Sequence, residues 1–140
     1  MKVTKYMTDR LVTADPDDGI RETFFKMRRE GVRHVPVVDG DDGLVGIISD
    51  RDLRRPDWVD EAPDLSHMYN LDDNLSVRDL MSSNVIVVHT YDRIRKAARL
   101  LMEHNFGALP VLNKEERLVG MLSAMDLLRA LDDTLTEAKG

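Results

Sequence analysis

"LVGIISDRDL", residues 44–53, returns 74 positions later as "LVGMLSAMDL", residues 118–127. Both copies keep a glycine, a serine and an aspartate in the spacing G-x-x-S-x-x-D. The same displacement of 74 positions makes 14 of 53 aligned pairs identical between residues 3–55 and residues 77–129. A repeat of this length indicates two copies of one supersecondary unit.

Both copies predict the same order of elements, strand-helix-strand-strand-helix. The first strand is expected at residues 11–14 and again at residues 85–88, where apolar and β-branched residues gather. The helix that follows has an aspartate at the position of its expected N-cap, Asp18 in the first copy and Asp92 in the second.

The first helix of each copy carries an apolar stripe at helical spacing. The stripe consists of Ile20, Phe24 and Met27 in the first copy and of Ile94, Ala97 and Leu101 in the second. Gly31 and Gly107 lie beyond the helix ends, where glycine commonly stops a helix. Two β-rich runs follow in each copy, and a last helix is expected to open at Ser49 and at Ser123.

The repeat also predicts how the chain is divided. The expected divisions are a first domain at residues 1–55, a linker at residues 56–74, a second domain at residues 75–130 and a C-terminal tail at residues 131–140. The linker is acidic and contains Trp58 and Tyr69, which are expected to pack on the body of the protein. Because a unit of about 55 residues is marginally stable alone, the two domains are expected to bury surface against each other and to form a cleft.

Composition excludes several classes of protein. The 140 residues contain no cysteine, so disulfides, thiolate catalysis and cysteine-based zinc sites are excluded. The net charge of −6, with both signs interspersed, argues against nucleic-acid binding. The start of the chain has no apolar signal-peptide core, and no apolar run approaches the ~20 residues that span a bilayer. We therefore expect a cytoplasmic protein that binds neither nucleic acid nor membrane.

The repeated serine and aspartate have two interpretations. The pairs are Ser49 with Asp52 and Ser123 with Asp126. In the structural interpretation each pair is a helix capping box, worth about 1 kcal/mol. In the functional one the carboxylate accepts hydrogen bonds from ribose hydroxyls, while the serine and the amides of a helix start face phosphate. Gly46 and Gly120 favour the second interpretation, since glycine inside a strand often marks the close approach of a backbone or a ligand.

With these motifs, the chain resembles a tandem pair of CBS (cystathionine-β-synthase-type) domains. The segments that carry the resemblance are VTKYMT (residues 3–8) with VRDLMS (77–82), EGVRHVPVVD (30–39) with NFGALPVL (105–112), and the two G-x-x-S-x-x-D motifs. Lys5 stands where the family usually has aspartate. The resemblance covers nearly the whole chain except the linker and the last dozen residues. It implies an α/β (α+β) fold of two β-α-β-β-α repeats related by an internal pseudo-two-fold axis.

The resemblance also implies up to two sites for an adenosine-containing ligand in the cleft between the domains. Its adenine contacts correspond to Thr13, Ala14 and Val32 at the first site and to Val87, Val88 and Phe106 at the second. Its ribose contacts correspond to Asp52 beside Ser49 and to Asp126 beside Ser123. Its phosphate contacts correspond to Arg33 and His34 at the first site and to Gly107 and Ala108 at the second. Arg51, within the first motif, is a further candidate for phosphate, and Met125 takes its place in the second motif. Because only the first set is basic, the first site is expected to bind phosphate better.

The function implied is that of a stand-alone regulatory or energy-sensing module without catalytic residues, metal or required cofactor. Its ligand would be AMP, ADP, ATP or S-adenosylmethionine, and it would act by shifting a conformational population. The other expected partners are a second copy of the chain in a homodimer and an unknown regulated protein. Two alternatives remain: a structural protein-interaction module with empty sites, and an enzyme that hydrolyses a nucleotide with Asp52, Asp126 and His34. The histidines lack metal-ligand spacing, and neither Ser49 nor Ser123 lies in a nucleophile elbow with a histidine.

Overall fold

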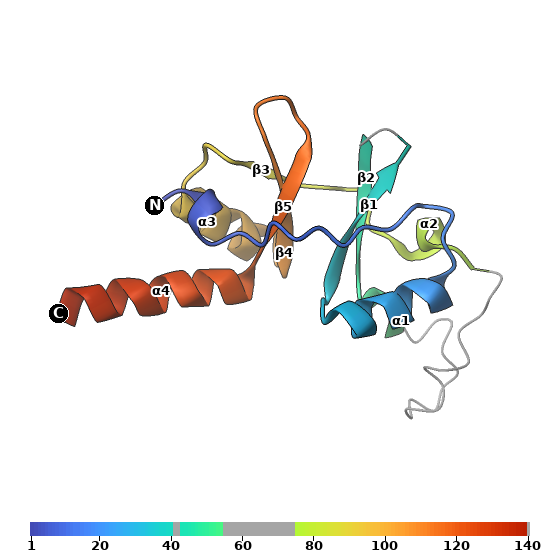
Figure 1. Cartoon of the computed structure of the whole chain (residues 1–140), viewed down its shortest axis with the longest axis horizontal. Coiled ribbons are helices and arrows are strands. Elements are labelled where there is room, and N and C mark those ends of the chain that lie inside the picture. Colours follow the sequence, from blue (N-terminus) through green and yellow to red (C-terminus); the bar gives the residue numbers. More distant parts are fainter. Residues whose placement is uncertain (41–42, 55–74, 140) are drawn as a thin grey trace. The chain divides into compact units, whose positions relative to one another are not determined.

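The chain forms two compact units, whose helices and strands are traced in Figure 1. The computed structural model describes residues 1–40, 43–54 and 75–139. The central unit is one continuous segment, Val12–Val85, whereas the terminal unit combines Met1–Leu11 with Ile86–Gly140. The predicted linker at residues 56–74, with the expected packing of its two aromatic residues, lies outside the described residues.

The central unit is built on an antiparallel strand pair and one long helix. Its elements are α1 (Ile20–Glu30), β1 (His34–Asp39), β2 (Gly43–Ser49), the 3-10 helix η2 (Asp52–Arg54) and α2 (Val77–Leu80). Strand β1 pairs with β2 in an antiparallel register that shifts between Val37 and Val38. The strand predicted at residues 11–14 is reduced to one pairing residue, Ala14, which forms a parallel bridge with Val37.

The terminal unit follows the same plan with a three-stranded sheet. Its elements are the 3-10 helix η1 (Val3–Lys5), β3 (Val88–His89), α3 (Ile94–His104), β4 (Ala108–Leu112), β5 (Leu118–Ser123) and α4 (Ala124–Lys139). Strand β3 runs parallel to β4, which pairs with β5 in antiparallel fashion. The strand predicted at residues 85–88 therefore begins only at Val88. Val88 pairs with Val111 in the terminal unit, as Ala14 does with Val37 in the central unit. Both residues of the first pair lie 74 positions after those of the second, so the two units share one plan.

Each unit has its own apolar core, and the predicted helix stripes lie in it. In the central unit Ile20, Phe24 and Met27 are buried among Val35, Val37, Ile48, Leu53 and Val77. In the terminal unit Ala97 and Leu101 are buried among Val3, Val88, Leu109, Val111 and Leu122, and Ile94 packs against them half-buried. The predicted class of fold, mixed helix and strand in two repeats, is confirmed.

Each compact unit takes its first segment from the other sequence repeat. Residues 1–11 belong to the terminal unit with the body of the second repeat, and residues 75–82 belong to the central unit with the body of the first. The bridges that join these segments to the bodies are Lys2–Arg93 and Thr8–Met121 in the terminal unit, and Ser76–Gly19 and Ser82–Ile47 in the central unit. The compact units are thus grouped differently from a division of the chain at residues 55 and 75.

The N-caps of α1 and α3 differ from the prediction. Gly19 and Arg93 occupy the N-cap positions, and neither makes a side-chain capping hydrogen bond. The carboxylates of Asp18 and Asp92 instead accept the backbone N–H three residues earlier, at 2.9 and 2.8 Å. The prediction that these aspartates are N-caps is therefore wrong, because they close the preceding turn instead.

Helices α1 and α3 both end at a residue in the left-handed conformation, but the residue type differs. Gly31 caps α1 in the left-handed conformation, with φ +69°, as predicted. Helix α3 is capped by Asn105 with φ 57°, a conformation that asparagine tolerates better than most residues. The predicted stop at Gly107 is wrong by two residues, and Gly107 instead leads into β4.

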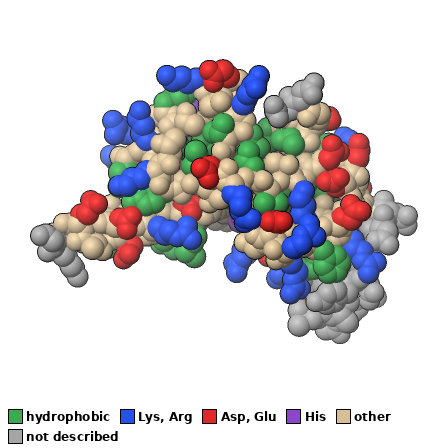
Figure 2. Space-filling view, in the orientation of Figure 1, with side chains coloured by type: hydrophobic (Ala, Val, Ile, Leu, Met, Phe, Trp, Pro, Cys, Tyr) green, Lys and Arg blue, Asp and Glu red, His purple; other side chains and the backbone are tan. Residues whose placement is uncertain are grey.

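Helix α4 opens directly after Ser123, as predicted, and continues for 16 residues. Residues 131–139, predicted as a tail, are therefore helical. After Ser49 the described counterpart is only η2, a turn of three residues. No described helix is long and apolar enough to cross a membrane. Charged side chains of both signs occur on the face shown in Figure 2.

One side of α4 packs on its own unit, and the other side is apolar and exposed. On the packed side Ala130 is 3% exposed. There the Tyr6 hydroxyl also donates a hydrogen bond to Asp133 Oδ2 at 2.7 Å, which raises the pKa of Tyr6 to about 12. The opposite side, here called the α4 stripe, consists of Met125, Leu128, Leu131 and Leu135, which are 57, 55, 53 and 55% exposed. This helix therefore presents its apolar side away from its own core.

Candidate functional site

The candidate first site lies where β1 begins and β2 ends. His34 pairs with Ser49 in the β1–β2 register. The backbone C=O of Arg33 accepts the N–H of Asp50 at 2.9 Å, which holds the two strand ends together. The structure therefore brings Arg33 and His34 next to the first G-x-x-S-x-x-D motif. Arg51, within that motif, is exposed.

The candidate second site occupies the same place in the terminal unit. Ala108 pairs with Ser123 in the β4–β5 register. The backbone C=O of Gly107 accepts the N–H of Ala124 at 3.0 Å. The two assigned phosphate positions again lie next to the motif, but they carry no charged side chain.

The serine and aspartate of both motifs form reciprocal capping boxes. Asp52 Oδ2 accepts the Ser49 N–H at 2.8 Å, and Ser49 Oγ accepts the Asp52 N–H at 3.1 Å. The corresponding distances between Ser123 and Asp126 are 2.8 and 3.2 Å. The hydrogen bonds of the structural interpretation are confirmed in both pairs; the second pair caps α4, and the first lies in the turn that leads into η2. A capping box orients the carboxylate without consuming all of its acceptor positions, so the ribose assignment stays a prediction.

The two aspartates differ in burial and in their second partner. Asp126 is 3% exposed, whereas Asp52 is half-buried. Asp126 Oδ1 lies 2.6 Å from Arg129 Nη1, and the Arg129 side chain is 65% exposed. Arg129 is not among the residues predicted from the sequence. Its position three residues after Asp126 on a predicted helix is the signal that could have found it.

The glycine of each motif makes room for a short segment from the other sequence repeat, residues 81–82 at Gly46 and residues 7–8 at Gly120. A Cβ atom on Gly46 would lie 2.6 Å from Met81 Sδ and 2.9 Å from the Ser82 carbonyl oxygen. On Gly120 it would lie 2.8 Å from the Thr8 carbonyl oxygen and 2.9 Å from Met7 Sδ. The predicted close approach is confirmed, and its partner is backbone and methionine. These glycines therefore do not by themselves indicate a ligand.

The residues assigned to adenine are divided between the cores and the surface. Ala14 and Val88 are buried in the two cores. The backbone groups of Ala14 are both used within the unit, since its N–H donates to the Pro36 carbonyl at 3.1 Å and its C=O accepts the Val38 N–H at 2.9 Å. The others are half-buried: Thr13, Val32, Val87 and Phe106.

Two of these half-buried residues have partners of their own. The Thr13 carbonyl accepts a hydrogen bond from Lys26 Nζ. The Phe106 ring stacks on His104 with ring centres 5.4 Å apart. Any adenine ring that uses these groups must share them with Lys26 or with His104.

The environment of His34 lowers the pKa of its imidazole. Burial lowers the pKa of His34, the carboxylates of Asp50 and Asp52 oppose this, and Arg33 lowers the pKa further. The neutral imidazole is therefore favoured in the folded protein. A neutral imidazole still offers one N–H donor, and a phosphate placed beside it would favour the protonated form.

We expect the free energy of unfolding to fall as the pH drops below 6.5, in part because of His34. The folded-state pKa lies below the unfolded value, so the unfolded chain binds more protons in that window. His34→Gln should remove this part of the slope in urea unfolding followed by circular dichroism between pH 7.5 and pH 5.5. His104→Gln, at an exposed histidine, is the matched control. The same pH slope in wild type and His34→Gln would contradict the expectation.

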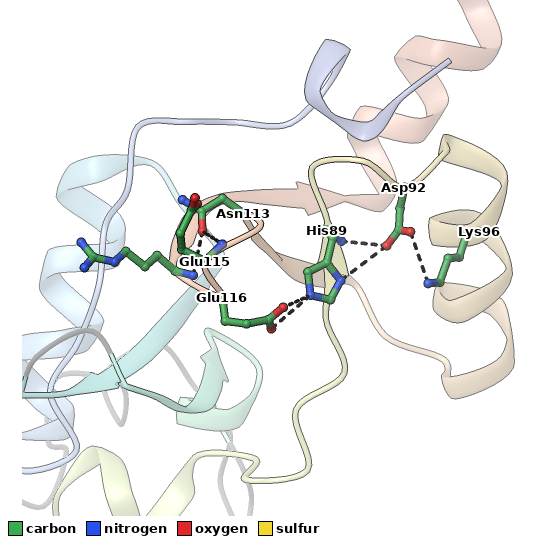
Figure 3. A network of polar contacts seen from close by, with 7 residues as sticks. His89, Asp92, Lys96, Asn113, Glu115 and Glu116 are labelled. Carbon is green, nitrogen blue, oxygen red and sulfur yellow. Dashed lines mark hydrogen bonds and ion pairs between the residues drawn. The ribbon is translucent and has the colours of Figure 1, made fainter.

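A polar network next to β3 was not anticipated from the sequence (Figure 3). His89 Nε2 lies 3.0 Å from Glu116 Oε1, and Lys96 Nζ lies 3.3 Å from Asp92 Oδ1. Glu116 adopts φ 62°, the left-handed conformation, at the turn between β4 and β5. The network ties this turn to the turn between β3 and α3. Across the described segments, no group of His, Asp and Glu side chains is arranged to hold a metal ion.

Comparisons with known proteins agree on one family. The family model for the CBS domain matches residues 3–56 and 77–133. A CBS domain-containing protein of Dictyostelium discoideum is 33% identical over 135 residues, which cover 92% of this chain and 90% of that protein. The crystal structure of the CBS-pair protein CBSX2 from Arabidopsis thaliana has a TM-score of 0.81 at 28% identity, covering 99% of this chain and 97% of that chain. CBSX2 in complex with AMP has a TM-score of 0.77 at 30% identity, covering 95% and 97%.

The chain also matches part of several longer relatives. Inosine-5'-monophosphate dehydrogenase of Methanocaldococcus jannaschii is 27% identical over 128 residues, which cover 91% of this chain but only 23% of the enzyme. The chain spans 46% and 47% of two further archaeal relatives. Similar sequences thus occur both in a protein of about this length and within larger proteins.

Proposed function

This chain belongs to the CBS-domain family, and from that premise we propose that it is a regulatory module that binds an adenosine nucleotide. The observation that carries the proposal is the meeting of Arg33 and His34 with the first G-x-x-S-x-x-D motif at one end of the β1–β2 pair. The complex of CBSX2 with AMP, at 30% identity, supports an adenosine-containing ligand.

The first site supplies a complementary group for each part of a nucleotide. The exposed Arg33 guanidinium offers a planar fork of donors that fits phosphate. His34 adds a second donor, and the Asp52 carboxylate accepts from the ribose hydroxyls. No bond is made or broken. The ligand changes the conformational population only by its differential affinity for two states, and a regulated protein would respond to that change.

A screen by melting temperature tests the proposal directly. AMP, ADP, ATP and S-adenosylmethionine are added separately at millimolar concentration to the purified chain. A ligand at 100 times its Kd stabilises the folded protein by about 2.7 kcal/mol. We expect a rise with at least one adenine nucleotide. No rise with any of the four would favour the structural module with empty sites.

Asp52→Ala should weaken binding of AMP about tenfold or more, and Asp126→Ala should weaken it less. Removing an acceptor that is hydrogen-bonded to ligand costs about 1.5–3 kcal/mol when the acceptor is charged. Isothermal titration calorimetry measures both affinities. Equal losses in the two variants would contradict the preference for the first site.

A matched control separates binding from capping. Ser76 and Asp79 form the same capping box at α2, outside both candidate sites. Asp79→Ala should therefore cost about 1 kcal/mol of stability, as Asp52→Ala does through its own cap, and leave the affinity for AMP unchanged. If Asp52→Ala behaves like Asp79→Ala in both measurements, Asp52 is only a cap.

A homodimer through the α4 stripe is part of the proposal. Leu128, Leu131 and Leu135 are spaced three and four residues apart, which is the spacing of a two-helix seam. All three are more than half exposed, while the opposite side of α4 already packs on its own unit. A second copy presents the same apolar stripe, so pairing two stripes about a two-fold axis removes both from water.

Hydrolysis of the nucleotide is the alternative that assigns chemistry to the same residues. Incubation of the chain with ATP and analysis of the products by chromatography distinguishes the two functions. If the protein is the proposed regulator, the ATP is recovered intact. We also propose that the protein is cytoplasmic, because adenine nucleotides are available there.

A further inference from the structure

Asp126 already has a protein partner on each carboxylate oxygen. Its Oδ2 accepts the Ser123 N–H at 2.8 Å, and its Oδ1 lies 2.6 Å from Arg129 Nη1. The Asp126 side chain is only 4% exposed, whereas that of Arg129 is 65% exposed. The arginine thus stands on the solvent side of the carboxylate that is assigned to ribose at the second site.

A ribose hydroxyl must compete with this arginine for the carboxylate. Both hydrogen bonds are charge-assisted because the acceptor is a carboxylate, but the guanidinium also brings a full positive charge that a neutral hydroxyl lacks. A neutral nucleoside that displaces Arg129 leaves the guanidinium without its anionic partner. A nucleotide brings an anion of its own, and the displaced guanidinium can pair with it.

The second site also lacks another source of positive charge at its assigned phosphate positions. Gly107 and Ala108 stand where the first site has Arg33 and His34. Arg129 belongs to the same unit as Gly107 and Ala108, and its long side chain is largely exposed. It is therefore a cation of this site that can change partner at small cost to the core.

We propose that Arg129 is the specificity-determining residue of the second site, exchanging the Asp126 carboxylate for the ligand phosphate when ribose binds. The inference rests on the proposed function. It assigns the second site to phosphorylated adenosine ligands and makes the ion pair a barrier against uncharged adenosine. The exchange involves no covalent step, and only the partner of the guanidinium changes.

The test measures selectivity in protein whose first site is weakened. In the Asp52→Ala background, calorimetry gives the affinities for AMP and for adenosine with Arg129 and with Arg129→Gln. We expect Arg129→Gln to raise the affinity for adenosine, lower that for AMP, and reduce the ratio of the two about tenfold or more. Arg129→Lys, which keeps the charge, should retain part of the preference. Arg117→Gln, at an exposed arginine of the same unit, should leave the ratio unchanged.

The outcomes separate this inference from the proposed function. If the wild-type chain binds AMP but the ratio is the same with and without Arg129, the inference is wrong and the proposed function stands. The same conclusion holds if Asp52→Ala abolishes all AMP binding, because the second site is then not a nucleotide site. If wild type binds neither AMP nor adenosine at millimolar concentration, both fail. Far-UV circular dichroism checks that Arg129→Gln is folded, and Arg129→Lys carries the comparison if it is not.

Discussion

Gly120→Ala should displace residues 1–8 from the terminal unit and lower the free energy of unfolding by about 3 kcal/mol. The added Cβ would lie 2.8 Å from the Thr8 carbonyl oxygen, a distance that real Cβ atoms essentially never show. Since this neighbour is backbone, no rotation of a side chain relieves the overlap. The bridge between Thr8 and Met121, with hydrogen bonds of 2.8 and 2.9 Å, must open instead.

The equivalent change in the central unit and a permissive glycine provide the comparison. Gly46→Ala should have a similar effect, because Ser82 presents its carbonyl oxygen at 2.9 Å from the added Cβ. Gly19→Ala is the control: no atom lies within 4 Å of its Cβ and its φ is −71°, so only the change of residue at the N-cap of α1 acts, and the loss should stay below about 1 kcal/mol. Urea unfolding measures the three variants. A loss below about 1 kcal/mol in Gly120→Ala would contradict the prediction, because residues 1–8 would then accommodate the added Cβ without being displaced.

The double variant Leu128→Glu with Leu131→Glu should convert the proposed homodimer to a monomer. Each leucine buried in a two-helix seam contributes about 1.5–3 kcal/mol, so losing two from each chain weakens the dimer by well over a hundredfold. The charges introduced would also face each other across the two-fold axis. Sedimentation equilibrium at micromolar concentration measures the mass.

A control variant distinguishes the α4 stripe from apolar exposure in general. Met102 on α3 is 74% exposed and lies outside the α4 stripe. Met102→Glu should leave the dimer intact if α4 alone forms the interface. Wild-type protein that sediments as a monomer, or a double variant that remains a dimer with unchanged circular dichroism, would contradict the proposed seam.

The elements that could be predicted from the sequence are those that depend on local spacing. The stripe of Ile20, Phe24 and Met27 specifies which side of α1 is buried, because helical periodicity relates neighbours along the chain. The pairing of Ser49 with Asp52 follows equally from their spacing of three residues. The repeat then carried each of these local predictions to the second unit.

The features that could not be predicted depend on which of two similar partners a group selects. Asp18 lies between a turn and a helix, and its carboxylate can serve either; the structure shows that it serves the turn. Met7 and Met81 are equivalent in the repeat, and nothing in their spacing says that each packs against the glycine of the other copy.

Each compact unit contains a first segment from the other sequence repeat, and this sets the order in which the two units can be completed during synthesis. The central unit, Val12–Val85, contains both of its pieces once residue 85 has left the ribosome. Residues 1–11 have emerged earlier but must wait, because Arg93 and Met121, their bridging partners, are made later. Since domains generally fold as units while the chain grows, residues 1–11 can be incorporated only after the whole central unit has been made.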